Sequence, residues 1–215
     1  MIGLRLERAP ISVVCLGAHP DDIEVGAAGL LASLAERYSD TRFLFAIATG
    51  DSDRQKEATD SAHSLLGDRV SLEFGGLTDG MLPYSHAAET KAFIRATAQS
   101  PEDVDLVLAP RRGDRHQDHR LVGDLAHQIF RSQMILEYEI VKLEGDLGPV
   151  GAYHSLTFAA AESKLDHLTS HFPSQQSKPW YDRETFAALM RIRGVECLST
   201  DGYAEAFHAD RMSIL

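Results

Sequence analysis

The stretch Gly17-Ala18-His19-Pro20-Asp21-Asp22-Ile23-Glu24 decides how the fold of this chain is interpreted. It follows an apolar run at residues 11–16, which is typical of a buried strand. It precedes residues 26–31, where small and apolar side chains open a helix. One imidazole and three carboxylates therefore fall where a strand ends and a helix begins. In open α/β sheets ligands bind outside the carboxyl ends of the strands, so this stretch predicts both a fold class and the position of a site.

A second cluster of the same chemistry, Arg115-His116-Gln117-Asp118-His119, follows another apolar run at residues 104–109. Two imidazoles and one carboxylate with an open position are typical of a catalytic zinc site, and a free carboxylate and a free imidazole can move protons. Each residue taken alone is better explained as a helix cap or a solvated side chain. Together the two clusters favour one site, built from His19, Asp21, Asp22, His116, Asp118 and His119.

The first two thirds of the chain alternate between apolar runs and amphipathic segments. This alternation predicts right-handed parallel crossovers and a Rossmann-like, mostly parallel sheet with helices on both faces. The expected strands are residues 11–18, 42–48, 70–74, 104–109 and 135–141, and the expected helices are residues 27–38, 54–66, 87–99 and 119–132.

After a Gly- and Pro-containing loop at residues 143–149 the pattern changes. It predicts a C-terminal α+β extension with strands at 153–158 and 204–209 and helices at 161–172 and 182–193. The chain has 215 residues, is 44% hydrophobic and shows no internal repeat or linker, so we expect residues 1–215 to form a single domain.

Composition excludes several classes of function. The formal net charge of -11 argues against a nucleic-acid partner, because phosphate binding requires a basic face. No apolar run approaches the roughly 18 residues of a membrane span, and residues 1–10 lack the apolar core of a signal peptide. Only two cysteines are present, Cys15 and Cys197, which does not indicate a disulfide framework. We therefore expect a cytoplasmic protein.

Ala18-His19-Pro20-Asp21-Asp22-Ile23-Glu24 followed by His116-Gln117-Asp118-His119 resembles the bacterial branch of the PIG-L/LmbE-like family of zinc-dependent N-deacetylases, and the resemblance covers nearly the whole chain. It implies a hydrolase that removes the N-acetyl group from an amino sugar or an N-acetylglucosamine-containing small molecule. It also implies Zn²⁺ as the usual metal, with Fe²⁺ or another divalent ion accepted by some members. By this resemblance the metal ligands are His19, Asp22 and His119.

The resemblance also implies roles for the other three side chains of the two motifs. Asp21 is implied as the general base that activates the zinc-bound water, and His116 as the group that polarises the amide or protonates the leaving amine. Asp118 is implied as the residue that orients His116. Weaker candidates for substrate contact are Asp51, Arg54, Asp79 and His208, and the roles of Glu24, Arg111 and Arg112 stay open.

Two alternatives remain at this stage. An amidase acting on a larger N-acyl conjugate or an antibiotic intermediate would use the same site. A non-catalytic sugar-binding or dinucleotide-binding module would use only the fold, but Gly26-Ala27-Ala28-Gly29 is too short for the dinucleotide fingerprint. The substrate, the pathway and the oligomeric state are not determined by the sequence, and a homo-oligomer is compatible with it.

Overall fold

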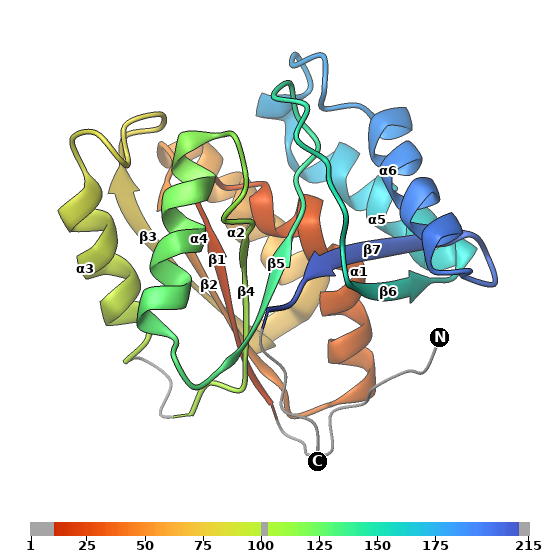
Figure 1. The fold of residues 1–215 in the computed structure, drawn as a ribbon, viewed down its shortest axis with the longest axis horizontal. Helices are drawn as coiled ribbons and strands as arrows, with labels where there is room; N and C mark the ends of the chain where they lie inside the picture. The colour runs from red at the N-terminus through yellow and green to blue at the C-terminus, as the bar shows by residue number, and fades with distance from the viewer. Residues whose placement is uncertain (1–10, 100–102, 211–215) are drawn as a thin grey trace.

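One seven-stranded sheet organises the structure, a computed structural model that describes residues 11–99 and 103–210 (Figure 1). The strand order is β3-β2-β1-β4-β5-β7-β6. Five strands run parallel, namely β1 (Ser12–Gly17), β2 (Arg42–Thr49), β3 (Val70–Leu77), β4 (Leu106–Pro110) and β5 (Met134–Tyr138). β7 (Tyr203–His208) is antiparallel to β5 and to β6 (Ala152–Leu156). The predicted mostly parallel α/β sheet is thus confirmed, whereas residues 1–10 lie outside the described part.

Helices cover both faces of the sheet because its strands are apolar on both sides. Neighbouring residues of β1 show this, since Cys15 packs into one core cluster and Leu16 into the other. Short 3₁₀ turns lie at Gly67–Arg69 and Pro173–Gln175. Among the described residues no helix is both long and apolar enough to cross a membrane. One face carries α1 (Asp22–Arg37), α2 (Ser52–Leu66), α5 (Phe158–His171) and α6 (Arg183–Glu196), and the other carries α3 (Ala87–Thr97) and α4 (Gln117–Ile129).

The first helix begins at Asp22, earlier than the expected start at residue 27. Acidic side chains in a first turn interact favourably with the positive end of a helix, and Asp22 and Glu24 occupy that turn. The helix lies close to β5, because a Cβ on Gly26 would come within 2.3 Å of the Tyr138 ring. The Tyr138 hydroxyl in turn donates a hydrogen bond to the Leu16 carbonyl at 2.6 Å. The second half of the first motif, residues 22–24, therefore lies on a helix turn that packs closely against the sheet.

Boundaries in the C-terminal part also differ from expectation, among them the end of β5 and the start of α5. β5 ends at Tyr138 rather than at residue 141, because β7 pairs only with Glu137 and Tyr138 and the chain then leaves the sheet. α5 begins at Phe158, a residue that the sequence pattern placed in a strand. The Thr157 side chain accepts a hydrogen bond from the backbone N–H of Ala160 at 3.1 Å, and this cap sets the start of the helix.

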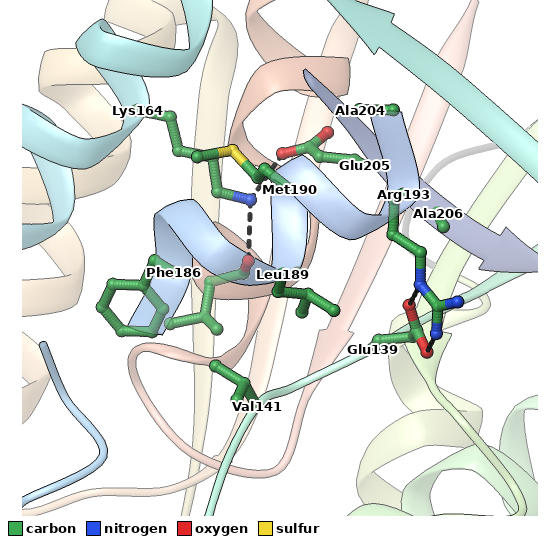
Figure 2. A pocket seen from close by; sticks show the side chains of 12 residues that line it. Glu139, Val141, Lys164, Phe186, Leu189, Met190, Arg193, Ala204, Glu205 and Ala206 are labelled. Atoms are coloured by element: carbon green, nitrogen blue, oxygen red, sulfur yellow. Dashed lines mark hydrogen bonds and ion pairs between the residues drawn. The ribbon is translucent and has the colours of Figure 1, made fainter. Parts of the chain in front are cut away.

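A small cavity of about 20 Å³, room for about one water molecule, lies among α1, α5, α6 and β7 (Figure 2). The Lys164 ammonium donates to Glu205 at 2.6 Å, and Glu205 also accepts the backbone N–H groups of Gly29 and Leu30. The Arg193 guanidinium faces Glu139 through two hydrogen bonds of 2.8 and 2.6 Å. We call this region the ion-pair cavity. Its pairs tie the C-terminal helices and β7 to the first helix and the segment after β5.

Candidate metal centre and active site

The two motif clusters meet at the carboxyl edge of the sheet because β1 and β4 are neighbouring parallel strands. His19 follows β1 and Asp22 opens α1, while His116 caps α4 and His119 lies in its first turn. A cavity of about 340 Å³ opens beside them, within the size range of small-molecule sites. Its further walls come from the segment after β5 and the loop after α5, at Ile140, Lys142, Leu143, Glu144, Lys178, Pro179 and Trp180.

The three implied metal ligands face one another. His19 Nδ1 lies 3.0 Å from His119 Nε2 and 3.5 Å from Asp22 Oδ2. His119 Nε2 lies 3.2 Å from Asp22 Oδ1. Tetrahedral ligands at about 2.0–2.1 Å from zinc stand about 3.3 Å from each other, so the spacing suits a small divalent ion. The set of two imidazoles and one carboxylate is used by zinc hydrolases and also by non-haem iron sites, so it does not identify the metal.

Neighbouring carboxylates flank the outer nitrogens of both imidazoles. His119 Nδ1 lies 3.1 Å from Asp114 Oδ2, which favours the tautomer with the proton on Nδ1 and the Nε2 lone pair toward the centre. His19 Nε2 lies 3.0 Å from Asp79 Oδ1 and 3.4 Å from Asp118 Oδ2, while its Nδ1 faces His119 and Asp22. The two inner nitrogens and the Asp22 carboxylate thus converge on a space that favours a cation, either a proton or a divalent ion in its place.

The charges around His19 and Asp22 favour a positive charge between them. Burial lowers the pKa of His19, but Asp22, Asp118 and Asp79 outweigh it and raise that pKa well above its usual value. Burial raises the pKa of Asp22, yet His119 and His19 hold it well below its usual range. The site therefore stabilises a cation, and Asp22 stays ionised as a ligand must.

Asp21 lines the same cavity as the three ligands and pairs with Arg54. The Arg54 Nη2 donates to Asp21 Oδ1 at 2.6 Å, and Arg54 Nη1 lies 3.8 Å from Asp79 Oδ2. Burial raises the pKa of Asp21, and the Arg54 guanidinium opposes this rise. Glu57, three residues further along α2, instead accepts hydrogen bonds from the backbone N–H and the hydroxyl of Ser174. Asp21 is a carboxylate with a raised pKa inside the cavity, which suits a general base.

His116 lies half-buried between the ligands and the cavity. Its ring stacks on His119 with centroids 4.5 Å apart. Its Nδ1 accepts the backbone N–H of Asp118 at 3.3 Å, which caps α4 and leaves the ring proton on Nε2. Burial lowers the pKa of His116, with further lowering by His119 and His19, so the ring is neutral at pH 7. A neutral ring with a free Nε2–H can donate to an oxygen in the cavity.

The Asp118 carboxylate has different partners from those implied by the resemblance. It accepts the backbone N–H groups of Gly80 at 2.6 Å and Leu82 at 3.2 Å, and it lies beside His19. Only the backbone of Asp118 contacts the His116 ring. The reason is geometric, because Asp118 points back from the first turn of α4 toward the loop after β3. Asp118 therefore orients His19 and that loop rather than His116.

Among the weaker substrate candidates, the structure brings Arg54 and Asp79 into the cavity and leaves Asp51 and His208 outside it. The Asp51 side chain caps α2 by accepting the backbone N–H of Arg54 at 2.9 Å. His208 ends β7 and pairs with Glu137 near the carboxyl end of β5, but it is not among the residues that line the cavity. The interaction of Asp79 with His19 lowers the pKa of Asp79 to about 2, so the Asp79 carboxylate is ionised.

The residues with open roles have internal partners. Glu24 is fully buried, accepts the Ser61 hydroxyl at 2.6 Å, and has a pKa raised by burial to about 8. Arg111 donates to the carbonyl oxygen of Asp146 at 2.6 Å, and Arg112 pairs with Glu137 at 2.7 Å. None of these three is part of the cavity wall.

Sequence reasoning missed the partner of His119. Asp114 is buried, and its carboxylate receives His119 Nδ1–H at 3.1 Å and the Lys142 ammonium at 2.8 Å. Burial raises the pKa of Asp114, but His119 and Lys142 outweigh burial and lower it. The available signal was a further Asp just before the second motif. No comparable signal marked the cavity-lining Lys142 and Lys178.

Comparison with known proteins agrees with this geometry. The model of the PIG-L family, described as GlcNAc-PI de-N-acetylase, matches residues 14–130. The chain therefore belongs to the PIG-L family, and the resemblance of its motifs is confirmed. No curated protein matches the sequence significantly.

Solved structures share the fold. N,N'-diacetylchitobiose deacetylase from Pyrococcus horikoshii is 22% identical, with a TM-score of 0.70 over 93% of this chain and 83% of that one. A zinc-inhibited teicoplanin deacetylase is 15% identical, with a TM-score of 0.70 over 94% and 100%. The 4-carboxy-2-hydroxymuconate hydratase GalB from Pseudomonas putida KT2440 is 17% identical, with a TM-score of 0.70 over 96% and 98%. Since one of the three is named a hydratase, the fold alone does not define the reaction.

Proposed function

We propose that this protein is a metal-dependent hydrolase that removes the N-acetyl group from an amino sugar or a small molecule containing N-acetylglucosamine. The observation that carries the proposal is the convergence of His19 Nδ1, Asp22 and His119 Nε2 on one point beside a cavity. Family membership supports it, as do the names of two structural neighbours, which are deacetylases of an N-acetylated sugar and of a glycopeptide antibiotic.

The three ligands would hold a divalent ion, with Zn²⁺ favoured and Fe²⁺ compatible. When bound, such an ion polarises a carbonyl oxygen and acidifies a water molecule. Asp22 would be the negatively charged ligand, and its orientation is fixed because Oδ2 accepts the backbone N–H groups of Ala18 and His19 at 2.9 and 2.8 Å. Backbone contacts thus hold the Asp22 carboxylate in place before any substrate binds.

The remaining groups handle protons. Asp21 accepts a proton from the water that attacks the amide carbon, and Arg54 holds its carboxylate in place at 2.6 Å. His116 donates its Nε2–H to the oxygen that gains negative charge in the transition state. When the C–N bond breaks, a proton reaches the departing nitrogen, and the products are acetate and the free amino sugar. Asp79 and Arg54, both in the cavity wall, are the proposed sugar contacts.

Two broader features belong to the proposal. One sheet joins strands from both ends of the described chain, which supports treating residues 1–215 as one domain. Both cysteines, Cys15 and Cys197, are free and buried, which supports a reducing, cytoplasmic setting. Partners other than a small substrate are not required by the site.

An acetate-release assay on N-acetylglucosamine derivatives, with and without a chelator, tests the proposal. We expect release that the chelator abolishes and that Asp21→Asn reduces by about 10²–10⁴-fold, the range of a general base, while bound metal is kept. Release of a longer acid instead of acetate would favour the amidase alternative. Full activity of the Asp21→Asn variant would show that Asp21 is not the base.

A further inference from the structure

Lys142 lies in the cavity wall, yet its ammonium is not available to a substrate. Its Nζ donates to Asp114 Oδ2 at 2.8 Å, to Asp146 Oδ1 at 3.0 Å and to the Ile140 carbonyl at 3.2 Å. An ammonium has three donors, so these partners use all of them. The side chain is only 5% exposed. Lys142 therefore faces inward, toward Asp114, whose carboxylate contacts the proposed metal ligand His119.

Asp114 is the link between Lys142 and a metal ligand. The same oxygen, Oδ2, receives the Lys142 ammonium and the Nδ1–H of His119. The other oxygen accepts the backbone N–H of His116 at 2.7 Å. A buried carboxylate held at both oxygens has one orientation, and that orientation points Oδ2 at the ligand ring.

The segment that carries Lys142 is fastened to the loop before α4. The Asp146 carboxylate accepts the backbone N–H of Arg115 at 2.7 Å, and Arg111 donates to the Asp146 carbonyl at 2.6 Å. Lys142 and Asp146 thus close a network between the two segments. Because Leu143 and Glu144 lie between them and line the cavity, the network joins the substrate wall to the metal centre.

We propose that Lys142 is a positioning residue for the metal centre, whose ammonium holds the Asp114 carboxylate where it receives the Nδ1–H of His119. This inference rests on the proposed metal site. Loss of an outer-sphere partner of a metal-bound histidine lowers metal affinity by about 10–100-fold. Lys142 acts one contact further out, so we expect its loss to lower affinity by about 10-fold.

The test compares two buried lysines that each pair with a carboxylate. Lys142→Met removes the ammonium at the metal centre, and Lys164→Met removes the one in the ion-pair cavity (Figure 2). Zn²⁺ affinity of the metal-free full chain is measured by competition with a chromophoric chelator, alongside thermal unfolding. We expect both variants to lose stability and only Lys142→Met to lose affinity. Equal affinity changes in the two variants, or none in Lys142→Met, would overturn the inference.

A double variant shows the route of the effect. If Lys142 acts through Asp114, Asp114→Asn alone and Asp114→Asn with Lys142→Met bind Zn²⁺ equally weakly. A further loss in the double variant would contradict this route. If wild type binds no Zn²⁺, the proposed metal site itself is wrong. If wild type and Lys142→Met bind Zn²⁺ equally tightly, only the proposed role of Lys142 is wrong.

Conservative variants cover the case in which Lys142→Met does not fold. Lys142→Arg keeps the positive charge, and Lys142→Gln keeps a donor without the charge. We expect the Arg variant to bind Zn²⁺ within about 3-fold of wild type and the Gln variant to bind about 10-fold more weakly. A Gln variant that binds as tightly as the Arg variant would contradict the assigned role of the charge.

Discussion

Two clusters of buried charge in this molecule differ in one respect. In the ion-pair cavity each carboxylate faces a cation, with Lys164 on Glu205 and Arg193 on Glu139. At the proposed metal site, within the described residues, the ion-pair contacts of the Asp22 carboxylate are with the imidazoles of His19 and His119. Buried charge requires an opposite charge. In the ion-pair cavity a lysine and an arginine supply a permanent positive charge, whereas Asp22 faces imidazoles that can give up a proton, and we interpret this exchangeable charge as suited to a metal ion.

The largest effect is expected in the ion-pair cavity. Glu205→Gln leaves the Lys164 ammonium buried without its charged partner, so we expect a loss of about 3–5 kcal/mol in the free energy of unfolding. Denaturant unfolding of the metal-free chain measures it, and the Zn²⁺ affinity of the folded variant should equal that of wild type. A weakened Zn²⁺ affinity would show that the two clusters are not independent.

The next prediction separates metal binding from catalysis. His116→Gln removes the proposed Nε2–H donor, so we expect kcat for acetate release to fall by about 10²–10³-fold. Metal content should be unchanged, because His116 is not one of the three proposed ligands. Loss of metal from this variant would move His116 into the ligand set.

The smallest effect concerns His167, which lies near the ion-pair cavity. Burial, with the nearby charges of His171 and Lys164, lowers the pKa of His167 to about 4. Between pH 6.5 and 4 the unfolded chain binds a proton that the folded chain does not, so stability falls as the pH falls. His167→Gln removes this loss, and we expect it to be less acid-sensitive than wild type by about 1–2 kcal/mol over that range. The same pH dependence of the free energy of unfolding in wild type and His167→Gln would contradict the lowered pKa.

The sequence predicted the parallel part of the fold and the position of the site. Strands buried on both faces are continuous apolar runs, and the two motifs follow β1 and β4 directly, so both signals are local. The start of α1 was placed too late because Asp22 and Glu24 resemble loop residues unless the helix dipole is considered. Local patterns thus gave the elements but not their caps.

Contacts between distant residues were not predictable from the sequence. Lys142 reaches Asp114 only because β5 ends early and its following segment returns to the loop before α4. Asp118 orients His19 because the first turn of α4 faces the loop after β3. His208 lies in a segment with an alternating strand signal, which carried no information on its distance from the site, and it lies beside Glu137, outside the cavity wall.

The central claim is that His19, Asp22 and His119 require a cation, and metal content tests it most directly. Elemental analysis of the mildly purified wild type and of the His119→Gln variant, followed by Zn²⁺ titration of both, is the measurement. We expect about one divalent ion per wild-type chain, and a loss of affinity in the variant larger than the about 100-fold limit for an outer-sphere change. A wild type that neither retains nor binds a divalent ion, or a variant that binds Zn²⁺ as tightly as wild type, would contradict the claim.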